Sequence, residues 1–147
     1  MMRDQEIIQY PGFRNIYDDA GNAIGFEFRI RSNYYRGVYL SLLNVGRVTV
    51  DNEEFLPHSG AVTWIISGKE YTPEEMAEDN VSFWPISETA TIRVKKPGGL
   101  AQGYHDVSLR WGHRSSYMPP SMTVFDDNSK ELGKSGDFLD NRRMLIV

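Results

Sequence analysis

The chain has 147 residues, 16 basic against 20 acidic side chains, a formal net charge of -4 and no cysteine. This length fits one domain and allows a hydrophobic core large enough to fold without a metal or a disulfide. Disulfides are excluded by composition. The mildly acidic balance argues against a general electrostatic grip on nucleic acid or on an anionic membrane.

The N-terminal residues lack the apolar stretch of a signal peptide, so we expect no secretion signal. Charged side chains continue to Glu6, and only Ile7 and Ile8 separate them from Gln9, far fewer apolar residues than a signal peptide needs. No run of about 18 apolar residues occurs anywhere, so a membrane-spanning helix is not expected. We therefore expect a cytoplasmic protein without a membrane partner.

The first third of the chain predicts a β-hairpin. Between Asn22 and Arg31, apolar and polar side chains alternate, which is typical of a strand with one buried face. A turn cluster at residues 18–22 precedes this strand, and Phe13 and Ile16 indicate another strand before the turn. Four apolar residues share the expected buried face: Ile24, Phe26, Phe28 and Ile30.

The middle of the chain predicts two further hairpins. Residues 45–50 form a β region in which Val48 and Val50 share a face, and a polar turn follows at 51–52. Residues 61–67 are rich in β-branched and aromatic side chains. A serine–glycine pair ends this segment, and such pairs are typical of two-residue hairpin turns.

One short helix is predicted after Thr72. This threonine can cap the helix, Pro73 suits the first helical position, and Glu75 stands where a capping box requires an acidic residue. Asp79 and Asn80 are typical of a helix end, so the helix contains only a few residues.

The last third predicts more strands around a long irregular stretch. Residues 89–96 alternate, a Pro-Gly-Gly turn occupies 97–99, and 104–110 form another strand. Residues 115–140 contain two prolines and many turn formers, so we expect an irregular surface excursion there. The apolar residues 144–147 predict a last strand that ties down the C-terminus.

These elements predict the fold class. Several short strands with one short helix indicate a mostly β protein, with residues 1–147 forming a single antiparallel β-sandwich domain. A jelly-roll-like arrangement is one option within this class.

No segment matches a catalytic or metal-binding motif. His105 and His113 are eight residues apart, roughly 26 Å along one extended strand, which is too far to share a metal ion. His58 lies in a polar loop without an obvious partner. The adjacent carboxylates at 53–54 point to opposite faces of a strand, and those at 74–75 are explained by the helix start. We therefore expect no catalytic residue, metal or cofactor on this chain.

Two aromatic segments are candidates for contact with a partner. Tyr34, Tyr35 and Arg36 interrupt a strong strand pattern, and these residue types are enriched at interface hot spots. Tyr117 and Met118 precede two prolines that stiffen the backbone. We expect these five residues at a partner interface or at the rim of a pocket. The alternative is that both segments pack their own side chains.

The three tryptophans are candidates for stacking on sugars. Trp64 and Trp111 lie in strong strand patterns and are expected in the core. Trp84 precedes a proline in a less regular stretch, so it is the freest of the three to contact a ligand.

Taken in order, five segments resemble the small, or β, subunit of bacterial C-glycoside deglycosidases, over about residues 10–120. The segments are Gly25-Phe26-Glu27-Phe28, Tyr34-Tyr35-Arg36-Gly37, Gly68-Lys69-Glu70-Tyr71-Thr72, Lys96-Pro97-Gly98-Gly99-Leu100 with Gly103-Tyr104-His105, and Ser116-Tyr117-Met118-Pro119.

This resemblance implies a β-sandwich that binds a larger α subunit with a sugar-isomerase-like barrel. Such complexes cleave the carbon–carbon bond between an aglycone and a sugar already oxidised to its 3-keto form. The resemblance also implies that the general base and a divalent metal, expected to be manganese, belong to the α subunit. This chain is then expected to be the non-catalytic subunit of a carbon–carbon lyase.

Two other functions remain open from the residues alone. A free-standing carbohydrate-binding β-sandwich module would use exposed tryptophans and tyrosines and would bind sugar without a partner. A metal-dependent β-barrel enzyme of the cupin type would need His and Glu side chains at closer spacing than this sequence offers.

Overall fold

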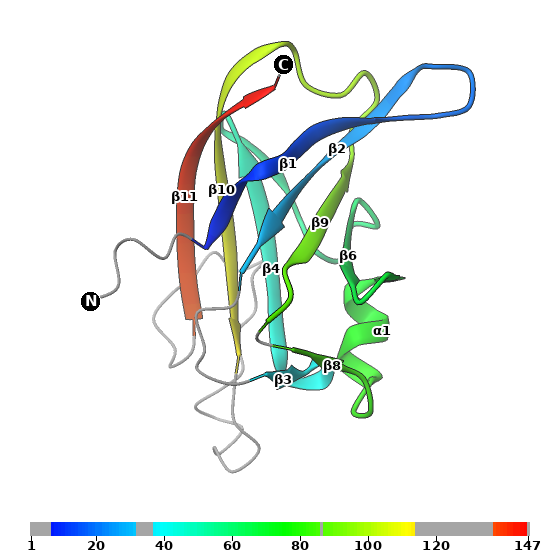
Figure 1. The fold of residues 1–147 in the computed structure, drawn as a ribbon, viewed down its shortest axis with the longest axis vertical. Coiled ribbons are helices and arrows are strands. Elements are labelled where there is room, and N and C mark those ends of the chain that lie inside the picture. Colours follow the sequence, from blue (N-terminus) through cyan, green and yellow to red (C-terminus); the bar gives the residue numbers. More distant parts are fainter. Residues whose placement is uncertain (1–6, 32–36, 86, 114–136, 147) are drawn as a thin grey trace.

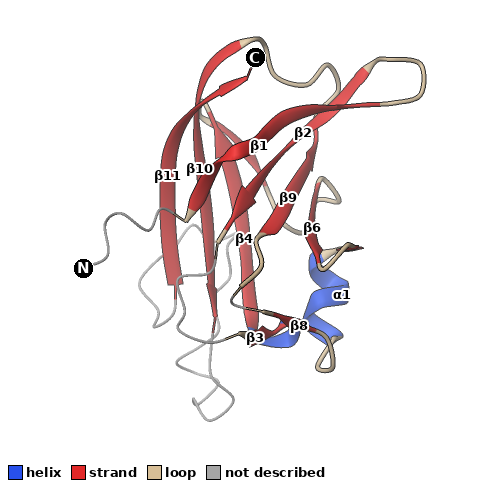
Figure 2. Ribbon diagram, viewed as in Figure 1, coloured by secondary structure: helices blue, strands red, loops and turns tan. Residues whose placement is uncertain are grey.

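The structure is a computed structural model that describes residues 7–31, 37–85, 87–113 and 137–146. In this part of the chain, two sheets pack face to face, and the one α-helix lies with a small third sheet at one end (Figures 1 and 2). All the hydrogen-bonded strand pairs described are antiparallel. The predicted antiparallel β-sandwich with one short helix is confirmed.

The two main sheets contain five and four strands. In spatial order, the five-stranded sheet contains β1 (Ile8–Tyr17), β2 (Ala23–Ile30), β9 (Ala90–Lys95), β6 (Val62–Ile66) and β7 (Lys69–Tyr71). The four-stranded sheet contains β11 (Asp137–Ile146), β10 (Gly103–His113), β4 (Leu43–Val50) and β5 (Glu53–Phe55). The chain passes between the two sheets after β2, after β5 and after β9, which makes a sandwich.

The small sheet and the helices close one end of the sandwich (Figure 1). These elements are β3 (Val38–Tyr39), the 3-10 helix η1 (Leu40–Leu42), α1 (Pro73–Glu78) and β8 (Phe83–Trp84). The capping box at the start of α1 forms as predicted, because Thr72 accepts from the Glu75 amide while Glu75 accepts from the Thr72 amide. The hairpin turn between β6 and β7 is also confirmed, with positive φ angles of 53° and 81° at Ser67 and Gly68.

The first strand bridges the open edge between the two sheets. Residues 10–13 of β1 stand opposite Phe28 alone, so the strand bulges out of the five-stranded sheet. Across the gap, Arg142 of β11 donates to the Ile8 carbonyl at 2.7 Å, and its guanidinium lies 3.5 Å from the centre of the Tyr10 ring. These contacts join the edge strands of the two sheets.

Three tryptophans form a row of edge-to-face and tilted ring contacts through the core. Trp84 lies between Trp64 and Trp111, with ring centroids 6.0 Å apart in both pairs. Its indole nitrogen donates to the Glu88 carbonyl at 2.8 Å. The expectation that Trp84 is free to contact a ligand is therefore wrong: only 1% of this residue is exposed. It is buried because β8 folds over the end of the sandwich instead of following the surface.

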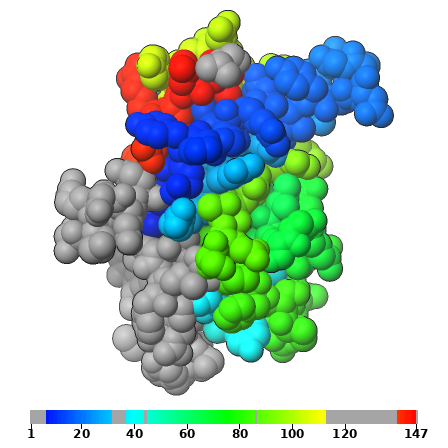
Figure 3. All heavy atoms as spheres, in the orientation of Figure 1, coloured from blue at the N-terminus to red at the C-terminus, as the bar shows by residue number. Residues whose placement is uncertain are grey.

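Two further expectations need correction. Residues 137–140, assigned to the irregular excursion, belong to β11, while the rest of that excursion, residues 115–136, lies outside the described residues. Ile24 is 45% exposed although it alternates with buried residues, because it lies near the start of β2, toward the tip of a hairpin that projects from the molecule (Figure 3). No helix among the described residues is long and apolar enough to cross a membrane.

Candidate functional site

The outer face of the five-stranded sheet contains a row of paired polar side chains. Glu27 of β2 accepts from Arg14 of β1 at 2.8 Å, and its other oxygen accepts from Arg93 of β9 at 3.0 and 3.2 Å. Arg93 also reaches Glu70 of β7 at 3.5 Å, and Thr63 of β6 donates to Glu70 at 2.6 Å. We call this set the polar ladder: it takes one side chain from each of the five strands.

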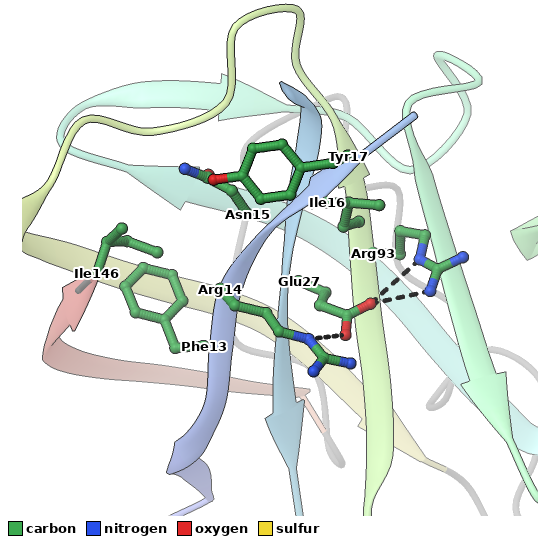
Figure 4. A pocket seen from close by; sticks show the side chains of 8 residues that line it. All are labelled: Phe13, Arg14, Asn15, Ile16, Tyr17, Glu27, Arg93 and Ile146. Carbon is green, nitrogen blue, oxygen red and sulfur yellow. Dashed lines mark hydrogen bonds and ion pairs between the residues drawn. The ribbon is translucent and has the colours of Figure 1, made fainter. Parts of the chain in front are cut away.

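The polar ladder borders a hollow of about 500 Å³ beside β1. Figure 4 shows the guanidinium groups of Arg14 and Arg93 converging on the Glu27 carboxylate from two sides. Glu27 is 5% exposed, and both its oxygens are engaged by cations. A general base needs a free oxygen aimed at a substrate proton, so this arrangement is a cross-strand clamp and not an acid–base pair.

His58 pairs with Glu74 at the start of α1. Its Nδ1 donates to the Glu74 carboxylate at 2.6 Å, and this hydrogen bond lowers the pKa of Glu74. Both side chains are more than half exposed. Sequence analysis found no partner for His58, because the two residues are brought together only when the 56–60 loop folds back onto the helix.

His105 joins three segments at another corner of the sandwich. Its Nδ1 faces the Asp51 carboxylate at 2.5 Å, and its Nε2 faces the Ala101 carbonyl at 2.7 Å. Burial opposes the charged ring, but these two acceptors outweigh it, so the pKa of His105 is raised. An imidazole that meets acceptors at both nitrogens is best satisfied as the cation, which makes this a charge-assisted contact between two loops.

The described residues do not bring metal ligands together. No group of three His, Cys, Asp or Glu side chains that could hold a metal ion occurs within the described ranges. His58 and His105 each meet a single carboxylate, and a structural zinc site needs four ligands.

All five residues predicted for a partner interface or pocket rim fall in segments whose placement the structure does not describe. Tyr34, Tyr35 and Arg36 lie within 32–36, and Tyr117 and Met118 lie within 114–136. Their proposed role stays a prediction.

A second group of exposed aromatic and apolar residues was not singled out by the sequence. Tyr39 of β3 stands opposite Phe83 of β8, with the two rings edge-to-face at 5.1 Å. Val81, in the turn that leads into β8, is also exposed. The signal for this group was weak, because strands of two residues show no periodicity.

Comparison with known proteins identifies the family. A family model described as "C-glycoside deglycosidase beta subunit" matches residues 3–117. The chain belongs to the C-glycoside deglycosidase beta subunit family. A relative with that name from Eubacterium cellulosolvens is 40% identical over 148 residues, covering 98% of this chain and 99% of the relative.

A second relative is more distant. The "3'-dehydrocarminate deglycosidase beta subunit" of a Microbacterium species is 30% identical over 120 residues, covering 81% of this chain and 83% of the relative. The C-glycoside deglycosidase beta subunit family model ends at residue 117, whereas the similarity to the Eubacterium protein extends over nearly the whole chain.

The first segment that resembles this beta subunit family has a packing reason for its glycine. A side chain on Gly25 would place its Cβ 2.1 Å from the carbonyl oxygen of Val94 on the neighbouring strand. Only glycine permits this approach of β2 to β9 without a shift of the backbone.

Proposed function

We propose that this chain is the accessory β subunit of a heteromeric C-glycoside deglycosidase. Its partner is an α subunit with a sugar-isomerase-like barrel, and the complex cleaves the carbon–carbon bond between an aglycone and a 3-keto sugar. The observation that carries this proposal is the 40% identity, over 98% of the chain, to a protein named as such a subunit.

The chemistry we propose begins with the keto group. It acidifies the neighbouring C–H positions, so a base can take a proton and leave an enolate. The enolate electrons then expel the aglycone as the carbon–carbon bond breaks, and the aglycone carbon receives a proton. Hydrolysis with acid cannot break that bond, which is why the sugar must be oxidised first.

We assign the base and the divalent metal, manganese in this proposal, to the α subunit. The described carboxylates and histidines of this chain support that division, because Glu27, Asp51 and Glu74 are each engaged by a cationic or imidazole partner within the chain. Such groups serve folding better than they serve proton transfer. This chain then contributes shape and contact surface, including the expected contacts of Tyr34, Tyr35, Arg36, Tyr117 and Met118.

A free-standing carbohydrate-binding module is the weaker alternative. It depended on tryptophans that stack on sugar rings, and Trp64, Trp84 and Trp111 are all buried in the core. The exposed tyrosines of the described ranges lie on three strands, β1, β3 and β10, and two of them, Tyr10 and Tyr104, already lie under arginine side chains.

Co-expression with the barrel subunit tests the proposal. The neighbouring reading frame is the first place to look for that subunit, and release of aglycone from a 3-keto C-glycoside is the readout. We expect turnover by the complex and none by this chain alone. Turnover by the isolated chain, or full activity of the barrel subunit without it, would contradict the proposal.

A further inference from the structure

Three exposed apolar side chains gather where β8 joins the rest of the fold. They are Tyr39 at 47%, Val81 at 81% and Phe83 at 44% exposure, and we call them the β3–β8 face. They lie at the end of the sandwich that also holds α1, at the bottom of Figure 1. Exposed apolar residues scattered singly need no explanation, but a rigid group of them does.

The turn that presents Val81 is fixed by its own hydrogen bonds. The carboxylate of Asp79 accepts from the amides of Val81 at 3.0 Å and Ser82 at 2.7 Å. The same turn is tied to η1, since Leu40 donates to the Ser82 carbonyl and Ser41 donates to the Asp79 carbonyl. Val81 is therefore held outward by a braced turn, and ordering it on binding costs little entropy.

The Phe83 ring is also held in place by its neighbours. It packs against the backbone at Gly37, where a Cβ atom would lie 2.3 Å from the ring. Tyr39 meets it edge-to-face, and the next residue, Trp84, anchors the strand in the row of three tryptophans. Aromatic side chains are enriched at the cores of protein interfaces, and tyrosine is enriched at their hot spots.

The chain segments that build this face carry only acidic charges, and Lys69 of β7 is a nearby cation that acts on Asp79. Between Tyr71 and Ile92 the chain has no lysine or arginine, and residues 37–46 carry no charge at all. The acidic residues in the first of these stretches are Glu74, Glu75, Glu78, Asp79 and Glu88. Hydrogen bonds from Ser82 and Val81, with a smaller effect of Lys69, lower the pKa of Asp79, so the border of the face stays negative at neutral pH.

We infer that the β3–β8 face is the centre of the surface that docks onto the α subunit, and that it fits an apolar patch bordered by lysine or arginine side chains. This inference rests on the function proposed above and adds the place and chemistry of the contact. The apolar residues supply the core of the interface and the acidic rim selects a basic partner, which is the usual division between core and rim.

The other exposed aromatics do not share these properties. Tyr10 lies under Arg142 at 3.5 Å, and Arg143 lies 5.3 Å from the centre of the Tyr104 ring. Their π faces already have a cationic partner within the chain, and the charge beside them is positive. They are therefore suitable controls.

Binding of the full chain to the purified α subunit tests the inference. We expect Val81→Glu and Phe83→Ala each to raise the Kd at least about tenfold, as removal of a hot-spot side chain does. Glu78→Lys should also weaken binding, although a lysine suits the C-terminal end of α1 and should leave the fold intact. The milder Val81→Thr, nearly equal in shape, should show a smaller loss in the same direction.

Matched variants at other surfaces complete the experiment. Ile24→Glu controls for the added charge and Tyr104→Ala for the lost ring, and both should bind like the wild type. Thermal unfolding of each variant separates lost binding from lost folding. The inference is overturned if Val81→Thr, Val81→Glu and Phe83→Ala all bind normally. It is also overturned if the control variants lose as much affinity as these three. Unchanged or tighter binding by Glu78→Lys would overturn the expectation that lysine or arginine side chains of the α subunit border the contact. Absence of binding by the wild-type chain would instead refute the proposed function.

Discussion

The polar ladder and the β3–β8 face are both exposed, but they differ in what their side chains already contact. In the ladder, Glu27 has two arginines and Glu70 has an arginine and a threonine, so each carboxylate has partners within the sheet. On the β3–β8 face, the two rings touch each other and Val81 is 81% exposed, and the adjoining residues 72–91 contain acidic residues but no lysine or arginine. Among these acidic residues, Glu74 pairs with His58 and Asp79 accepts from two backbone amides.

This difference separates surfaces that serve folding from surfaces that remain open to a partner. A charge paired across strands holds the sheet together and gains little from another molecule, which would have to desolvate it again. A fixed apolar group pays no such cost, and burying it releases the water around it. The number of charges on a surface is therefore a poorer guide to an interface than whether those charges pair with arginine or lysine side chains of the same chain.

The largest expected effect on stability comes from removing the buried tryptophan beneath the β3–β8 face. Because Trp84 is buried between two other tryptophans, Trp84→Ala should lower the free energy of unfolding by about 3–5 kcal/mol. Urea unfolding followed by tryptophan fluorescence measures this. Phe83→Ala is the matched control: it should cost about 1 kcal/mol or less, because the ring is half exposed, and yet it should weaken binding to the α subunit. Equal stability losses for the two variants would contradict the division in which Trp84 supports the fold and Phe83 contacts the partner.

Breaking the polar ladder should have an intermediate effect on stability and no effect on binding to the α subunit. Glu27→Gln removes the charged acceptor of Arg14 and the closer of the two charged acceptors of Arg93, so we expect a loss of about 2 kcal/mol in stability and unchanged affinity for the α subunit. The control Glu53→Gln removes an exposed pair with Lys96 and should cost about 1 kcal/mol at most. A weaker complex with Glu27→Gln would show that the ladder also belongs to the interface.

The fold could largely be predicted because its main strands are amphipathic. The faces formed by Ala90, Ile92 and Val94 and by Val48 and Val50 are buried as their alternation indicated. Local chemistry fixed the turn at Ser67-Gly68 and the cap of α1. Sheet membership could not be predicted in this way, because alternation tells which face of a strand is buried but not which strand lies beside it.

The candidate site was harder to predict, for two physical reasons. The polar ladder depends on the order β1-β2-β9-β6-β7, which brings together residues as distant as Glu27 and Arg93. The β3–β8 face depends on two strands of two residues each, which are too short to leave a periodic pattern. Trp84 was misjudged for the same reason, since nothing next to it in sequence shows that β8 folds over the end of the core.

The smallest expected effect on stability is the titration of His105. The pH dependence of folding therefore tests whether charges that are paired within the chain contribute to stability. Burial lowers the pKa of His105, but the hydrogen bonds to Ala101 and Asp51 outweigh this and raise it. Burial likewise raises the pKa of Asp51, and hydrogen bonds from the Asp106 amide and from His105 outweigh it and lower that value.

The signs of these two shifts define a pH window. A raised histidine pKa adds stability that is complete below the unfolded value of about 6.5 and is lost as pH rises through the folded value. A lowered aspartate pKa adds stability above about 3.9 that is lost as pH falls through the folded value. We expect stability to decline by about 1 kcal/mol as pH rises from about 6 to 9, a small amount because Asp51 is half exposed. Urea unfolding across this range should show the decline in the wild type and in His58→Gln, and a flat profile in His105→Gln. A decline of the same size in His105→Gln would mean that some other group titrates, and that the contact between the two loops does not depend on the charge of the ring.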